Sequence, residues 1–105
     1  MVPSTKTTAS RKRVLRTITS VAVPLMKQRG VVKAGIFGSY ARGEQKKESD
    51  VDILIQPRKG VGYFELIRLE RELMLALGRK VDLVTYRSLH PLLRDRILNE
   101  EVRII

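Results

Sequence analysis

The stretch GIFGSYARGEQKKESDVDILI, residues 35–55, decides the fold that we expect of this chain. An apolar strand ends in the turn Gly38-Ser39, and ten residues later Asp50-Val51-Asp52 opens a second apolar strand. Residues i and i+2 of a strand project from the same face of its sheet. We therefore expect the carboxylates of Asp50 and Asp52 to lie side by side, while Val51 faces the core.

Carboxylates held side by side repel each other, and a divalent cation is the usual remedy. A third carboxylate, Asp82, interrupts the apolar run Lys80-Val81-Asp82-Leu83-Val84. If this strand neighbours the strand of Asp52, the three carboxylates form a cluster of the kind that binds two metal ions for phosphoryl transfer. Each part also has a plainer explanation, namely a polar start to a strand for Asp50 and Asp52 and a surface position for Asp82.

The turn Gly38-Ser39 is a candidate phosphate-binding element. Its glycine lets backbone N–H groups approach a ligand closely, and Ser39 adds a hydroxyl donor where a short helix is expected to begin. Taken alone, such a turn is common between a strand and a helix. Arg42 follows closely and is either a further phosphate contact or an ordinary surface residue.

In combination these features resemble a known signature. The turn Gly38-Ser39, the spacing of ten residues and Asp50-Val51-Asp52 match the pattern of the DNA polymerase β-type nucleotidyltransferase superfamily. The extended pattern, residues 38–44 followed by residues 49–52, is similar in particular to the minimal prokaryotic nucleotidyltransferases, or MNT proteins. This resemblance covers residues 31–85.

The resemblance implies roles for the residues of the pattern. Gly38 and Ser39 would hold phosphates of an NTP, while Asp50 and Asp52 would bind two Mg²⁺ ions, with Mn²⁺ as a substitute. Asp82 would bind the catalytic metal and accept the proton of the attacking hydroxyl. The reaction would then transfer a nucleoside monophosphate, typically AMP from ATP, to an acceptor.

The acceptor is expected to come from a partner, because 105 residues leave little room for a second lobe. The MNT proteins include antitoxins of HEPN ribonuclease toxins, and some of them transfer AMP onto a toxin tyrosine. The leading hypothesis is therefore an antitoxin whose partners are ATP, or another NTP, and a HEPN toxin. Two alternatives stay open, namely a non-catalytic protein that masks the toxin and a basic nucleic-acid-binding module.

Hydrophobic periodicity and turn residues predict one α/β (α+β) domain over residues 10–105, after a flexible tail at residues 1–9. Its fold class is a small mixed β-sheet flanked by helices. Helices are expected over residues 10–29, 40–44, 63–77 and 89–99, and strands over residues 31–37, 51–55, 80–85 and 102–105.

Composition narrows the chemistry further. The chain has no cysteine and one histidine, so a metal would be held by oxygen atoms. It has no apolar run long enough to span a bilayer, and we expect a cytoplasmic protein without a membrane partner.

The net charge is +10, and residues 1–30 contain seven bases and no acid. Such charge favours polyanionic partners, but three exposed carboxylates argue against a specific nucleic-acid site. A homo-oligomer is compatible with all these features.

Overall fold

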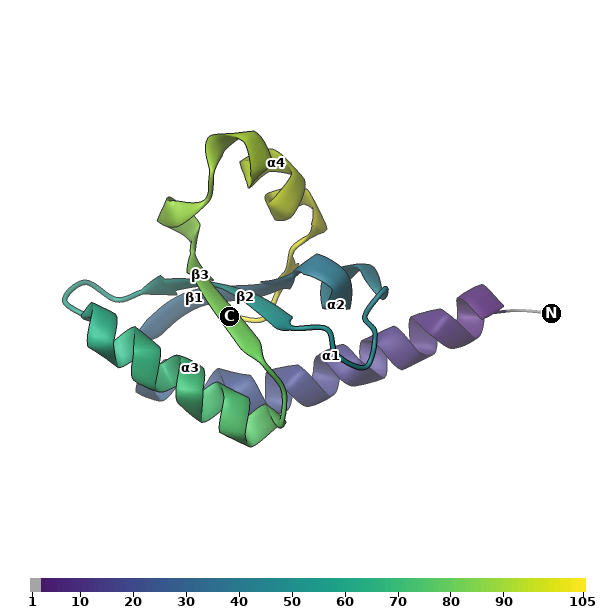
Figure 1. Cartoon of the computed structure of the whole chain (residues 1–105), viewed down its shortest axis with the longest axis horizontal. Helices are drawn as coiled ribbons and strands as arrows, with labels where there is room; N and C mark the ends of the chain where they lie inside the picture. Colours follow the sequence, from purple (N-terminus) through teal and green to yellow (C-terminus); the bar gives the residue numbers. More distant parts are fainter. Residues whose placement is uncertain (1–2) are drawn as a thin grey trace.

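The computed structural model describes residues 3–105, in which helices and strands alternate along the chain (Figure 1). In chain order the elements are α1 (Pro3–Gln28), β1 (Val31–Phe37), α2 (Gly38–Arg42), β2 (Val51–Pro57), α3 (Tyr63–Leu77), β3 (Val81–Thr85), the 3₁₀ helix η1 (Tyr86–Ser88), α4 (Pro91–Glu100) and β4 (Val102–Arg103). The predicted order of elements and the predicted fold class, a mixed sheet with flanking helices, are confirmed.

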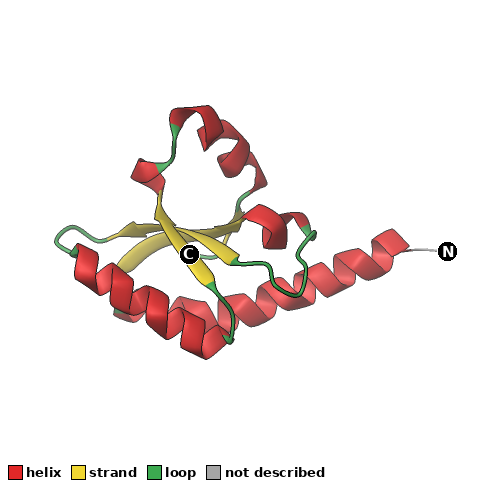
Figure 2. Cartoon of the chain, viewed as in Figure 1, coloured by secondary structure: helices red, strands yellow, loops and turns green. Residues whose placement is uncertain are grey.

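The four strands form one sheet in the order β3-β2-β1-β4 (Figure 2). Strand β1 runs antiparallel to β2 and β4, whereas β2 and β3 are parallel and are joined through α3. The central strand β2 is covered on both faces, since Ile53, Leu54 and Ile55 are all fully buried. This double burial explains why its sequence is a continuous apolar run after Asp52.

Helices α1 and α3 cover one face of the sheet, and α4 lies over the other (Figure 1). The larger core lies under α1 and α3, where Ile18, Ala22 and Met26 recur at four-residue steps along one side of α1. Leu69 and Leu73 form the corresponding apolar side of α3. A smaller cluster under α4 contains Leu54, Tyr86 and Leu89.

The predicted helix start at Ser10 is wrong, because α1 begins at Pro3. Proline is favoured in the first turn of a helix, and no glycine or further proline interrupts the chain before Ser10. The tail predicted for residues 1–9 is therefore helical from Pro3 onward, and Met1 and Val2 lie outside the described residues. No helix of the described chain is both long and apolar enough to cross a membrane.

Candidate active site

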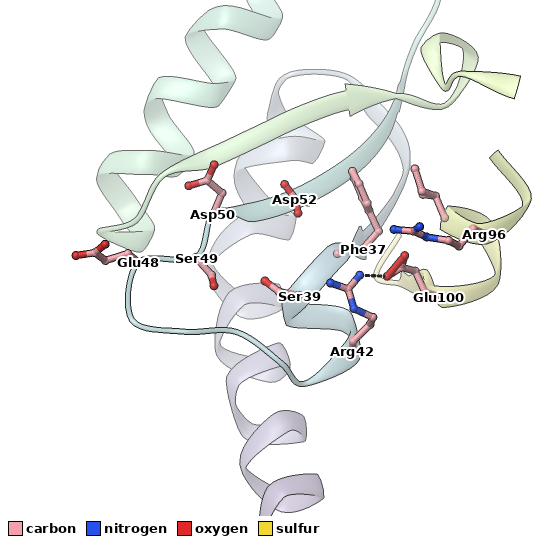
Figure 3. Close-up of a pocket in the computed structure, with 11 residues that line it drawn as sticks. Phe37, Ser39, Arg42, Glu48, Ser49, Asp50, Asp52, Arg96 and Glu100 are labelled. Atoms are coloured by element: carbon pink, nitrogen blue, oxygen red, sulfur yellow. Dashed lines mark hydrogen bonds and ion pairs between the residues drawn. The ribbon is translucent and has the colours of Figure 1, made fainter. Parts of the chain in front are cut away.

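An open pocket of about 530 Å³ lies where β1 ends and β2 begins (Figure 3). Five residues predicted for the site line it together: Gly38, Ser39, Arg42, Asp50 and Asp52. The remaining wall consists of Phe37, Glu48, Ser49, Arg96, Ile97 and Glu100. The sixth predicted residue, Asp82, does not line this pocket.

Strand pairing explains how residues far apart in the sequence meet here. In the antiparallel pair of β1 and β2, Phe37 lies opposite Asp52. The turn at Gly38 therefore follows directly beside the carboxylate of Asp52. In the parallel pair Asp52 lies opposite Asp82. Val51 is fully buried on the other face of β2, as the alternation of a strand requires. The sequence left it open whether the strands that carry Asp52 and Asp82 are neighbours, and the structure shows that they are.

At Gly38 the backbone of the turn lies directly against the carboxylate of Asp52. The φ of Gly38 is +74°, a left-handed value that side chains rarely adopt, and a Cβ atom there would clash with Oδ2 of Asp52. The absence of a side chain therefore lets the backbone of the turn lie against the carboxylate. Figure 3 shows Ser39, the next residue, on the same side of the opening as Arg42 and facing the two aspartates.

The pKa of Asp52 is raised to about 6. Partial burial is the largest cause, and the carboxylates of Asp82 and Asp50 add to it, while Arg42 acts in the opposite direction. The ionised form of Asp52 is thus disfavoured by its surroundings, so a bound cation would favour ionisation at this position.

We expect Asp52→Asn to stabilise the metal-free protein at pH 7. The pKa of Asp52 is higher in the folded protein than in the unfolded chain, so the folded state binds this proton more tightly. The free energy of unfolding should therefore fall as pH rises from the ordinary pKa of an aspartate to about 6. The variant lacks this pH-dependent loss and should be more stable at pH 7 by about 1–2 kcal/mol, after discounting for solvent screening. Urea unfolding in EDTA, from the ordinary pKa of an aspartate up to pH 7, measures the difference.

Asp95→Asn is the matched control, because Asp95 is an exposed carboxylate on α4 that does not line the pocket. Its pH profile should follow that of the unchanged protein. Identical profiles for Asp52→Asn and the unchanged protein would contradict the raised pKa of Asp52.

Arg42 lies in the pocket as predicted, but its guanidinium is already paired. Its Nη1 lies 2.6 Å from Oε2 of Glu100, and its Nε lies 3.0 Å from Oε1 of Glu44. The contact with Glu100 ties α2 to α4 across the pocket (Figure 3). A phosphate contact by Arg42 stays a prediction, because a ligand would compete with two carboxylates for this side chain.

Helix α4 contributes residues that the sequence did not single out. Arg96 and Glu100 are one helical turn apart and both line the pocket. Glu100 has a side chain that is only 14% exposed. Within residues 10–105 the ion pairs involve Arg29 and Arg42, so the charge of Arg96 is not compensated by an ion pair. The sequence shows that Arg96 and Glu100 are spaced to lie on the same side of a helix. It does not show which part of the molecule that side of α4 faces.

The side chains of the site suit a hard divalent cation. Their donors are carboxylate oxygen atoms, the ligands preferred by Mg²⁺ and Mn²⁺. The raised pKa of Asp52 adds an electrostatic reason for a cation beside it. As the side chains stand in the described chain, however, no three Asp, Glu or His residues converge into a complete metal-binding group. A ligand that brings its own oxygen atoms, such as a triphosphate, would complete the coordination.

Residues 20–105 match the family described as polymerase beta, nucleotidyltransferase. The chain belongs to this nucleotidyltransferase family. The chain is 52% identical over 83 residues to a Methanocaldococcus jannaschii protein named as a candidate protein adenylyltransferase. That alignment covers 79% of this chain and 89% of the relative. The match confirms the enzyme class expected from Gly38, Ser39, Asp50 and Asp52.

Solved structures agree with this assignment. One structure, described as a candidate minimal nucleotidyltransferase, superposes on this chain with a TM-score of 0.76 and 36% identity. The superposition covers 86% of this chain and 92% of the other. Another, described as a toxin–antitoxin with AMP-PNP, has a TM-score of 0.73 and 25% identity, covering 83% of this chain and 72% of the other. The MNT resemblance is therefore confirmed at the level of the fold and the family.

Proposed function

We propose that this nucleotidyltransferase transfers AMP from ATP to a tyrosine of a HEPN-family toxin and thereby acts as its antitoxin. The observation that carries the proposal is the meeting of the Gly38 turn with Asp52, and of Asp52 with Asp82, on adjacent strands. The relative named as a candidate protein adenylyltransferase supports AMP as the transferred group and a protein as the acceptor. The toxin–antitoxin structure with AMP-PNP supports the nucleotide and the kind of partner.

The nucleotide would occupy the pocket beside Asp50 and Asp52. There the backbone and hydroxyl of Ser39 donate hydrogen bonds to phosphate oxygens, and Arg96 supplies a cation from α4. Asp50 and Asp52 would hold two divalent cations, which when bound neutralise the triphosphate and favour departure of pyrophosphate.

Asp82 suits the acceptor side of the reaction. It is exposed, lies opposite Asp52 on the edge strand β3, and is outside the wall of the nucleotide pocket. From there it accepts the proton of the attacking hydroxyl. The hydroxyl oxygen forms a bond to the α-phosphorus, and the bond between that phosphorus and the bridging oxygen to the β-phosphate breaks. Pyrophosphate leaves with the electron pair.

The proposal is tested by incubating the protein with labelled ATP, Mg²⁺ and a HEPN toxin from the same genome. We expect the toxin to gain AMP at a tyrosine, as shown by mass spectrometry, and to lose its ribonuclease activity. Toxin that is neutralised without any AMP adduct, or that is neutralised equally well by Asp52→Asn, would instead support the masking alternative.

Mg-ATP is expected to stabilise the folded protein. A ligand that binds only the folded state at a hundred times its Kd adds about 2.7 kcal/mol to the free energy of unfolding. Thermal melts should therefore shift upward by several degrees with Mg-ATP and much less with ATP in EDTA. An unchanged melting midpoint at millimolar Mg-ATP would contradict the nucleotide site.

Arg96→Met is expected to weaken Mg-ATP binding by about tenfold, since a charge-assisted hydrogen bond to phosphate contributes on the order of 1.5 kcal/mol. Arg68→Met is the matched control, because Arg68 is exposed on α3 and does not line the nucleotide pocket. Isothermal titration measures both affinities. Equal affinities for the two variants would place Arg96 outside the phosphate site.

A further inference from the structure

A second pocket, of about 620 Å³, lies at the opposite end of β2 from Asp52. It is formed by residues of β1, the end of β2, the loop before α3, η1 and α4. In Figure 1 the loop before α3 lies at the left and α4 lies at the top. Five of the residues that line this pocket are cations, and no carboxylate lines it within the described chain. The cations are Lys33, Arg58, Lys59, Arg87 and Arg94. We call this set the basic pocket.

The charges of the basic pocket are not balanced by ion pairs. Within residues 10–105 the ion pairs use only Arg29 and Arg42, neither of which belongs to the basic pocket. Five like charges around one concavity repel one another and concentrate anions from solution. The segments that carry these cations are distant in the sequence, so it is the fold that brings the positive charges together.

Two of the cations are positioned by the buried residue Tyr86. Nη1 of Arg94 donates to the backbone oxygen of Tyr86 at 3.2 Å, and Nζ of Lys33 lies 4.4 Å from the centre of its ring. The Tyr86 hydroxyl donates to Glu101, whose carboxylate lies against Gly35 outside the pocket wall. The carboxylate of Glu101 is thus engaged outside the wall of the basic pocket.

The loop that presents Arg58 and Lys59 is held at both ends. The backbone N–H of Arg58 donates to the oxygen of Gly30 at 2.6 Å, and that of Val61 donates to the oxygen of Arg58 at 3.2 Å. Gly60, with φ of +95°, permits this tight turn. A loop that is fixed before binding loses little conformational entropy when a ligand arrives.

We propose that the basic pocket binds a compact anion carrying two or more phosphate groups. Arginine side chains match phosphate oxygens in a bidentate manner, and the volume is that of a small-molecule site. A single-stranded nucleic acid fits less well, because it needs exposed aromatic rings for base stacking. The aromatic residue of this pocket, Tyr86, is buried and covered by Lys33.

The test is titration of the full chain with tripolyphosphate in EDTA at about 0.15 M salt. We expect saturable binding that weakens by about tenfold or more in the double variant Arg58→Glu, Lys59→Glu. The matched control is Arg68→Glu, Arg71→Glu, which makes the same change of charge at exposed positions of α3 outside both pockets. Its affinity should stay within about threefold of the unchanged protein.

Absence of saturable binding at millimolar tripolyphosphate would overturn the proposal, and so would equal weakening in both double variants. Single-stranded RNA that binds far more tightly than tripolyphosphate would replace it with a nucleic-acid surface. If the first double variant does not fold, Arg87→Glu on η1 provides the same test. AMP transfer should be unchanged in these variants, so a negative result here leaves the proposed function standing.

Discussion

AMP transfer should fall by about 10²–10⁴-fold in Asp82→Asn, the range typical of losing a positioned proton acceptor, while Mg-ATP affinity changes little. The physical reason is position. Asp82 lies opposite Asp52 but outside the wall of the nucleotide pocket, so it acts on the acceptor more than on the nucleotide. Single-turnover transfer of labelled AMP to the toxin measures the first quantity, and isothermal titration measures the second.

Asp52 of β2 and Asp50, which directly precedes this strand, should behave differently from Asp82. Both Asp50→Asn and Asp52→Asn remove an oxygen donor within the nucleotide pocket, so affinity and transfer should fall together. Combining Asp82→Asn with Asp50→Asn should cost little more than the worse single change, since residues that act as a unit are not additive. Full transfer by Asp82→Asn would remove Asp82 from the site.

A loss of transfer of about 100-fold or more is expected for Gly38→Ala, because the added methyl group displaces the Asp52 carboxylate from the turn. The left-handed φ of Gly38 adds a cost in stability on the order of 1–2 kcal/mol. The measurements are AMP transfer and urea unfolding.

Gly78→Ala separates these two effects. Gly78 caps α3 with φ of +66°, and a Cβ atom there would meet nothing within 4 Å. Both variants should lose similar stability, but only Gly38→Ala should lose transfer. Comparable transfer by the two variants would show that close approach between the turn and Asp52 is not needed.

Much of the site was predictable from short-range patterns. Alternation along the expected strand predicted that Asp50 and Asp52 lie side by side, and both line the pocket, although β2 itself begins at Val51. The glycine of the turn indicated a close backbone approach. That β2 and β3 are neighbours was stated only as a condition, because single-strand patterns carry no information about which strands pair. The structure supplies it through the register of Asp52 with Asp82.

Residues of α4 show where sequence reasoning stopped. This helix has no fully buried residue, so its apolar pattern gave no face from which to orient it. The positions of Arg96 and Glu100 in the pocket, and the pairing of Arg42 with Glu100, depend on how α4 docks over the sheet. The start of α1 was missed for a different reason, since a tract rich in Ser and Thr favours helix ends and turns but does not exclude a helix.

The edge position of β3 has a kinetic consequence. Asp82 and Asp50 are both exposed at an open rim of the sheet, so a folded acceptor can reach the reacting phosphate without any segment having to open first. The same openness admits water to the phosphate until the acceptor covers it. In the proposed reaction, the choice of a protein hydroxyl over water would then depend on how long the acceptor stays bound at this rim.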